Sequence, residues 1–179
     1  MLTDDNAARF LSVDGELARG VKQIVTVPNP AAHTDWSAVV PGGEQWKVLA
    51  AVATFTADAT VANRTPRVSI TIDGVLLWLN QDNAAVAATG IVQYFFTPAD
   101  PPAVISHGGN IMLMTYPHLL LPPGAVFGTS TVNITTNDQW SGIGLWVERH
   151  YMTDQQADSY AVEDLTRAVE LLQQIGAKT

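Results

Sequence analysis

Several common ingredients of a folded protein are missing or scarce in these 179 residues. Cysteine is absent, which excludes disulfide bonds, thiolate metal sites and cysteine nucleophiles. Charged residues make up only 15% of the chain, whereas hydrophobic residues make up 47% and predict a globular domain. A monomer solvates its whole surface, so this shortage of charge indicates that partner proteins cover part of the surface.

Basic residues are also few, and the chain is acidic. Nine Lys and Arg stand against 17 Asp and Glu, which gives a net charge of −8. An acidic chain repels phosphate groups, so we expect no direct binding to nucleic acid. The acidic start of the sequence, MLTDDNAARF, lacks the basic region of a signal peptide. Prolines at positions 117, 122 and 123 interrupt the most apolar stretch, 111–127, so we expect no membrane span and no membrane partner.

The residue patterns of common catalytic and cofactor sites are absent as well. There is no GxSxG elbow, and GGEQWKV lacks the ending of a phosphate-binding loop. The histidines are scattered without the spacing of metal ligands, at His33, His107, His118 and His150. We therefore predict no catalytic residue, no metal and no cofactor, and expect that the chain is not an enzyme. His150 is expected to form an ordinary surface pair with Glu148, which lies on the same face of a strand.

Residues 44–151 carry the signature of a β domain. In RVSITIDG, Val68, Ile70 and Ile72 alternate with polar residues, which is typical of a strand with one solvated face. Asp73-Gly74 then predicts a turn into the next strand. Many short strands follow with Gly and Pro between them and no helix, so we predict a mainly β chain with an antiparallel β-sandwich or jelly roll.

The stretch LLLPPGAVFGTS, residues 119–130, interrupts an apolar run abruptly. Pro122 and Pro123 cannot donate hydrogen bonds to a sheet, so a strand must end there. Gly124 can adopt a positive φ that other residues resist. The stretch is therefore predicted to be a sharp corner that joins two apolar strands.

The two ends of the chain differ from the middle. Residues 1–43 are interpreted as an N-terminal arm with a first strand, and residues 152–179 as a C-terminal α-helix that begins after a capping box at Thr153 and Gln156. A stripe along this helix repeats at spacings of four and three residues and comprises Ala161, Leu165, Ala168, Leu172 and Ile175. We expect the stripe to dock on a sheet or on a neighbouring subunit, with Leu165, Leu172 and Ile175 as interface residues.

Two tryptophans are further interface candidates. Trp36 lies in a long, proline-rich segment, and long loops in compact domains are often functional or bound by a partner. Trp146 alternates with Leu145 and Val147 and therefore lies on the opposite, wetter face of a strand. A tryptophan there indicates an interface or a ligand contact, and the alternative is a core contact in a strand covered on both sides.

Several motifs follow one another in a set order along residues 44–151. They are a Trp-led strand, an NR pair, an alternating strand, an LPPG corner and a D-x-W turn into a last strand that ends in VE. The residues concerned are Trp46, Asn63-Arg64, Val68 to Asp73, Leu121 to Gly124, Asp138, Trp140 and Val147-Glu148. This order resembles structural proteins of tailed bacteriophage virions.

This resemblance implies a jelly-roll virion protein without enzymatic activity or cofactor, of the capsid decoration (cement) type. It implies a homo-oligomer, such as a trimer, that contacts the major capsid protein or other virion proteins and is assembled in the host cytoplasm. Two alternatives remain open: a head–tail connector, collar or baseplate component, and a carbohydrate- or receptor-binding module that uses loops 33–45 and 135–142. An enzyme of the cupin type would need clustered histidines, which the sequence lacks.

Overall fold

The chain folds mainly as β-strands. The computed structural model describes residues 20–82, 84–100, 103–106 and 110–152. The strands are β1 (Val21–Thr26), β2 (Ser37–Val39), β3 (Glu44–Thr56), β4 (Arg67–Ile72), β5 (Val75–Gln81), β6 (Ile91–Pro98), β7 (Val104–Ser106), β8 (Ile111–Tyr116), β9 (Leu120–Leu121), β10 (Val126–Thr129) and β11 (Gln139–Tyr151). Within these ranges, no helix is long and apolar enough to span a membrane.

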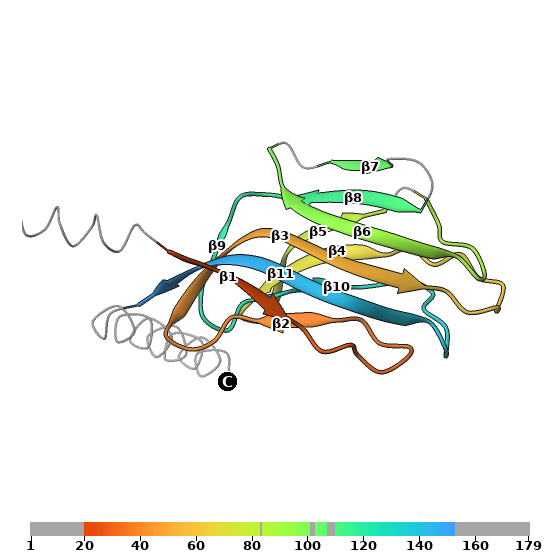
Figure 1. Ribbon diagram of the computed structural model, residues 1–179, viewed down its shortest axis with the longest axis horizontal. Coiled ribbons are helices and arrows are strands. Elements are labelled where there is room, and N and C mark those ends of the chain that lie inside the picture. The colour runs from red at the N-terminus through yellow and green to blue at the C-terminus, as the bar shows by residue number, and fades with distance from the viewer. Residues whose placement is uncertain (1–19, 83, 101–102, 107–109, 153–179) are drawn as a thin grey trace, which may run out of the picture.

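The strands form two sheets (Figure 1). The larger sheet has the order β1-β11-β3-β6-β8-β7, with β9 paired to β3, and the smaller sheet has the order β2-β10-β4-β5. The prediction of a mainly β chain with largely antiparallel sheets is confirmed. One pair departs from it, because β6 and β8 run parallel from Gln93↔Ile111 to Pro98↔Tyr116. The chain reaches β8 through β7, which takes the outer edge and returns antiparallel to β8.

The first two strands belong to the sheets and not to a separate arm. All six residues of β1 pair with β11, from Val21↔Arg149 to Thr26↔Gly144. β2 pairs with β10 in the other sheet. Two strands within the predicted arm and first strand, residues 1–43, thus pair with strands from the second half of the chain. The helix predicted for residues 152–179 lies outside the described residues from position 153 onward.

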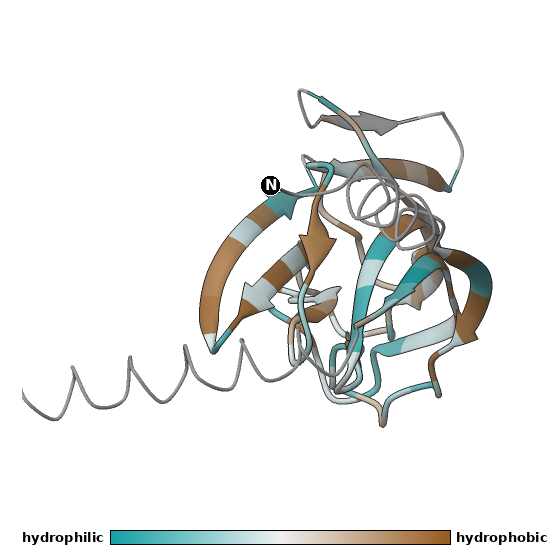
Figure 2. Cartoon of the chain, turned by 90° about the vertical axis from the view of Figure 1, so that its left-hand side faces the viewer, coloured by the Kyte–Doolittle hydropathy of each residue, from teal (hydrophilic) through white to brown (hydrophobic). Residues whose placement is uncertain are grey.

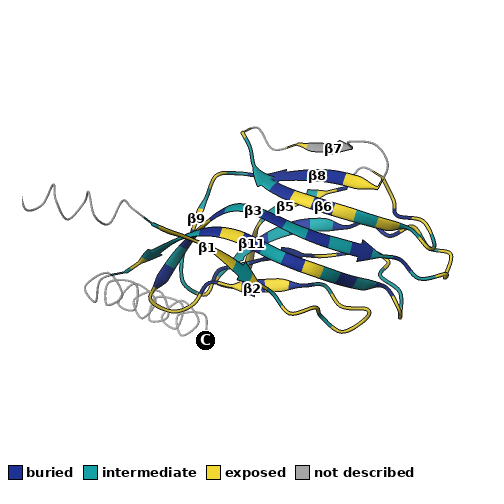
Figure 3. Ribbon diagram, viewed as in Figure 1, coloured by how far each residue is buried: buried dark blue, intermediate teal, exposed yellow. Residues whose placement is uncertain are grey.

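Apolar side chains from both sheets meet in a shared core. Along β3, β6 and β11, buried residues alternate with more exposed ones (Figure 3). The alternation of hydrophobic and hydrophilic residues is also visible from the end of the molecule (Figure 2). Phe127 of the smaller sheet packs on Tyr116 of the larger sheet, with ring centroids 5.0 Å apart. Such tilted aromatic contacts join the two layers and contribute beyond the area that they bury.

The predicted corner is present and carries the chain from one sheet to the other. β9 pairs with β3 in the larger sheet, and β10 begins two residues after Gly124 in the smaller sheet. Gly124 has φ +76°, and the amide of Ala125 donates to the carbonyl of Pro122 at 3.1 Å. The corner is also attached to the end of β2, because the Gly124 amide donates to the carbonyl of Val40, the residue after β2, at 2.9 Å.

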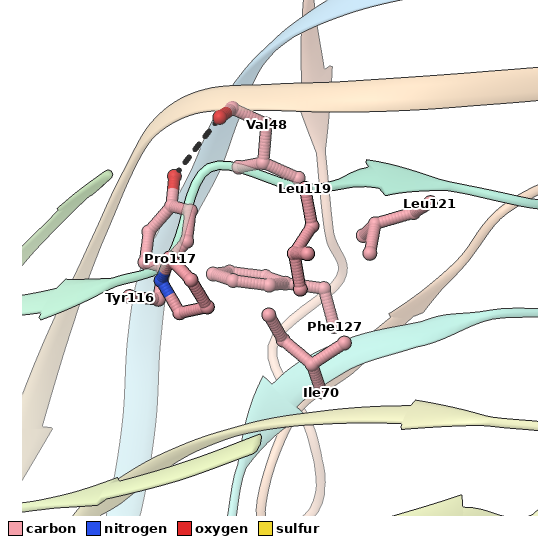
Figure 4. A pocket seen from close by; sticks show the side chains of 7 residues that line it. All are labelled: Val48, Ile70, Tyr116, Pro117, Leu119, Leu121 and Phe127. Atoms are coloured by element: carbon pink, nitrogen blue, oxygen red, sulfur yellow. Dashed lines mark hydrogen bonds between the residues drawn. The ribbon is translucent and has the colours of Figure 1, made fainter. Parts of the chain in front are cut away.

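A recess beside this corner shows how closely the layers meet (Figure 4). It leaves no room for a water molecule and is lined by Val48, Ile70, Tyr116, Pro117, Leu119, Leu121 and Phe127. The hydroxyl of Tyr116 donates to the carbonyl of Val48 at 3.1 Å. Burial raises the pKa of Tyr116, so the phenol stays neutral and keeps this hydrogen bond. The recess is a packed part of the core and not a ligand site.

Replacement of Gly124 by alanine tests the corner. No atom lies within 4 Å of the added methyl group, so only the positive φ opposes it. We expect Gly124→Ala to lower the free energy of unfolding by about 1–2 kcal/mol. Gly42→Ala is the matched control, because Gly42 has equal space without a positive φ, and it should leave stability unchanged or slightly raised. Denaturant unfolding measures both, and equal effects would contradict the account of the corner.

Candidate functional site

The outer face of the larger sheet carries an uncovered row of apolar side chains. Ile24 on β1 pairs with Trp146 on β11, and Trp146 pairs with Ala50 on β3. Paired residues in a sheet share a face, so these three side chains lie side by side. Ile24 is 72% exposed and Trp146 is 49% exposed. These exposed fractions are high for two large apolar residues that pair in a sheet.

A second apolar row continues across the same face. Gly144 pairs with Val52, Val52 pairs with Phe95, and Phe95 pairs with Leu113 on β8. Val52 lies between the buried residues Ala51 and Ala53, which places its side chain on the outer side. We call the two rows together the apolar band, defined by Ile24, Trp146, Ala50, Val52, Phe95 and Leu113.

Polar residues border the apolar band on both sides. On one side Lys22 pairs with Glu148, which pairs with Lys47. On the other side Thr54 pairs with Gln93. An apolar patch with a polar border is typical of a protein–protein contact. The band is therefore the candidate functional site, and the chemistry that it offers is burial against a partner.

The sequence-predicted interface residues have three different outcomes. Trp146 lies on the apolar band. Trp36 is 1% exposed and packs in the core, with its ring centroid 6.0 Å from those of Phe96 and Phe127. Trp36 directly precedes β2, and its side chain faces the core. It therefore cannot contact a partner at the surface of this protomer. Leu165, Leu172 and Ile175 lie outside the described residues.

A buried ion pair lies at one end of the two sheets. The side chains of Arg64 and Asp138 are both fully buried, with 3.0 Å between Nε and Oδ2. The guanidinium also donates to Asp58 Oδ1 at 2.5 Å and to Thr135 Oγ1 at 2.8 Å. Arg64 and Asp138 belong to two separate motifs of the bacteriophage-like pattern, NR and D-x-W. The structure brings these two motifs together.

Hydrogen bonds use both oxygens of the Asp138 carboxylate. The amide of Asp58 donates to Oδ1 at 2.8 Å, and the amide of Thr135 donates to Oδ2 at 2.6 Å. Burial opposes ionisation of Asp138, but the bonds from Arg64 and from these amides outweigh it and hold the pKa of Asp138 below its usual range. A carboxylate with its oxygens so engaged fixes loops in place, and we assign it a structural role.

A second acidic side chain ties the loop before β2 to the loop before β11. Asp35 accepts hydrogen bonds from the Thr131 hydroxyl at 2.7 Å and from the Trp140 indole at 3.1 Å. Trp140 is fully buried against Phe55, with ring centroids 4.9 Å apart. Trp36 in the loop before β2 and Trp140 at the start of β11 are thus both buried in the core and offer no stacking surface to a sugar.

Two further ionic pairs involve residues near the end of β11. His150 Nε2 lies 3.5 Å from Glu148 Oε1, as expected for the surface pair. Arg149 Nε donates to Glu44 at 2.8 Å, and this bond is the main reason that the pKa of Glu44 is lowered. Among the described residues, no group of three or more His, Cys, Asp or Glu is placed to hold a metal ion.

Comparisons with known proteins assign no family. No family model matches the chain. No curated protein matches it. The solved structure of PfGH50B is similar to it with a TM-score of 0.33 and 11% identity, over 77% of this chain and 23% of that chain. This chain thus spans less than a quarter of the length of that protein, and a likeness this weak assigns neither a fold family nor an activity.

The buried ion pair predicts a pH dependence of stability. Asp138→Asn leaves the Arg64 charge with less compensation and should lower the free energy of unfolding by about 3 kcal/mol at neutral pH. The native pKa of Asp138 is lowered, so its stabilising effect is complete above about pH 4 and is lost as the pH falls through the native value. The difference between wild type and variant should therefore shrink in acid.

Denaturant unfolding from pH 7 down to pH 2 measures this difference. Asp100→Asn is the control, because it removes the same charge from an exposed position and should change stability by less than about 0.5 kcal/mol. A difference for Asp138→Asn that stays constant over the whole pH range would show that the ionised carboxylate is not the cause.

Proposed function

We propose that this chain is a non-enzymatic structural protein of a bacteriophage virion, most specifically a capsid decoration (cement) protein. The observation that carries the proposal is the apolar band with its polar border. A surface of this kind gains free energy when a partner covers it, and a shell presents the same partner surface many times. The order of the NR, LPPG and D-x-W motifs supports a virion protein in particular.

The strand order supports a jelly roll, which is part of the proposal. β1, β11, β3 and β6 face β2, β10, β4 and β5, and the chain crosses repeatedly between the two sets. Two four-stranded sheets linked in this way are the arrangement of a jelly roll, with β7, β8 and β9 as an addition between the sixth and seventh strands of the motif. Jelly rolls occur in viral capsid proteins, and also in lectins and cupins.

The mechanism of a cement protein is burial. Each square ångström of apolar surface that a neighbour covers contributes about 25 cal/mol, and the contribution is repeated at every copy in the shell. The low charge fraction of 15% reduces the cost of covering this surface. The apolar stripe of Leu165, Leu172 and Ile175 would add a second contact by clasping an adjacent subunit.

A different position in the virion is the second candidate. A head–tail connector, collar or baseplate component would use the same apolar band, and only the number of copies separates it from a decoration protein. A carbohydrate-binding module is less well supported, because Trp36 and Trp140 in its expected loops are buried.

Copy number in the particle tests the proposal. We expect quantitative mass spectrometry of purified particles, from the phage that encodes this chain, to find it at a number comparable to the major shell protein. A number that matches a single ring would favour the connector or baseplate position. Absence of the chain from purified particles would overturn the proposal of a virion protein.

The apolar band itself can be tested by substitution. Trp146→Ser should weaken binding of the purified chain to particles that lack it by at least tenfold, because buried tryptophans are frequent hot spots of binding. The variant should fold normally, since Trp146 is half exposed. Val61→Ser is the control, because Val61 is 93% exposed and lies outside the strands. Equal binding of both variants would exclude the band as the contact surface.

A further inference from the structure

The apolar band lies beside the strand on which the described chain ends. β11 carries Trp146 in the band and ends at Tyr151, and the amide of the next residue, Met152, donates to the carbonyl of Gly43 at 2.9 Å. Residues 153–179 continue from there and lie outside the described ranges. They are thus attached next to an apolar surface that no described segment covers, since Ile24 is 72% exposed and Trp146 is 49% exposed.

The sequence of residues 153–179 predicts an amphipathic helix. Its apolar stripe comprises Ala161, Leu165, Ala168, Leu172 and Ile175. These residues repeat at spacings of four and three, which places them on one side of a helix. A single helix is marginal in water and is stabilised mainly by packing of its apolar side. Both the stripe and the band therefore gain free energy if the two surfaces meet.

The length of the segment fits the distance to the band. Trp146 and Met152 are six residues apart, which is about 20 Å along a strand. A helix that starts at Met152 and returns along β11 needs about 13 residues to cover this distance, so Leu165 lies above Trp146. By the same count, the second row of the band at Gly144 is reached between Ala168 and Leu172. The stripe is then centred on the band.

The order of charges along the segment fits the same placement. Followed back toward the end of β11, the spacing of four and three reaches Asp158 and Asp154, so this side of the predicted helix is first acidic and then apolar. The outer face of the sheet changes in the same order, because Lys22 and Lys47 flank Glu148 at the border of the band. In the described part of the chain, neither lysine has an ion-pair partner. The acidic start of the helix therefore meets a border of net positive charge.

The segment before β1 fits the band less well. Residues 1–19 also lie outside the described ranges. Their apolar repeat is shorter, from Ala7 to Leu17, and contains Gly15, which disfavours a helix. They also lead into β1, which is the edge strand, whereas the middle of the band lies on β11 and β3. The observations thus favour the C-terminal segment as the occupant of the band.

We propose that residues 153–179 fold back as a helix over the apolar band of their own chain. Attachment directly after Met152 holds the stripe near the band at a high effective concentration, which favours the same chain over a second copy. Two free chains with a net charge of −8 also repel each other. A partner that binds the band has to displace the segment first.

The cover itself does not depend on what the protein binds, but its role as a control of binding rests on the proposed function. A free decoration protein with a covered band resists self-association through this surface. A shell that displaces the segment gains the band as a contact. The released stripe can then clasp an adjacent subunit, as in domain swapping. One segment thus serves as a cover before assembly and as a clasp after it.

Labelling of a single thiol in the full chain tests the cover. The chain has no cysteine, and Ala50→Cys places one small thiol in the band, beside Trp146. Leu172→Lys in addition puts a charge into the stripe and should raise the rate at which this thiol reacts with a soluble reagent on the order of tenfold. Gln174→Lys adds the same charge on the opposite side of the predicted helix and should leave the rate unchanged.

Two controls separate the cover from other effects. Val61→Cys carries its thiol at a position that is 93% exposed and outside the strands, so neither lysine substitution should change its labelling rate. Circular dichroism checks that all variants fold. Dilution of the Ala50→Cys chain should leave its slow labelling unchanged, because a cover within one chain does not depend on concentration.

Two outcomes would overturn the inference. Equal labelling of Ala50→Cys with Leu172→Lys and with Gln174→Lys would show that the band is open or covered by another segment. Protection that is lost on dilution would assign the cover to a second copy.

The result is separable from the proposed function. Faster labelling with Leu172→Lys, together with absence of the chain from particles, rejects the virion role alone. Equal labelling with Leu172→Lys and with Gln174→Lys, together with presence of the chain in particles, rejects the cover alone.

Discussion

The buried ion pair between Arg64 and Asp138 is the constraint on which the arrangement of the two sheets depends. Arg64 lies on the crossing from β3 to β4, and Asp138 lies immediately before β11. Removal of two charges from water is costly unless their hydrogen bonds are satisfied. Here Asp58, Thr135 and two backbone amides satisfy them, so the low-energy position of the crossing relative to β11 is closely defined. The apolar band includes residues of β11 and β3, so its alignment depends on the same relation.

Local patterns in the sequence were enough to predict the local elements. The alternation in RVSITIDG predicts β4, and the predicted turn is present with positive φ at both Asp73 and Gly74. The corner at Gly124 was predictable because proline and glycine restrict or free the backbone directly. The pairing of β1 with β11 was not, because Val21 and Arg149 are far apart in the chain and either strand could pair elsewhere. The parallel pairing of β6 with β8 was not predictable either, because no local pattern in the sequence shows which strand lies beside β6.

The candidate site was predictable where a strand has one clearly apolar face. Trp146 alternates with Ile143, Leu145 and Val147, so its outward position follows from the period of a strand. Trp36 could not be placed in the same way, because its burial depends on Phe96 and Phe127, which reach it only in the folded chain. The NR and D-x-W motifs were visible separately, but no local signal indicates that their charges meet. Ile24 was missed because its exposed position depends on the register with Trp146.

The antiparallel pairing of β1 with β11 has a mechanical consequence. Val21 lies opposite Arg149, so the described chain enters β1 and leaves β11 at the same end of these two neighbouring strands. Tension applied between these two points would act across the ladder and open its six pairs one after another, starting at Val21. Tension along the strands would have to break them together. The β1–β11 pairing thus resists little force when Val21 and Arg149 are pulled apart. It resists a larger force when the load slides β1 along β11.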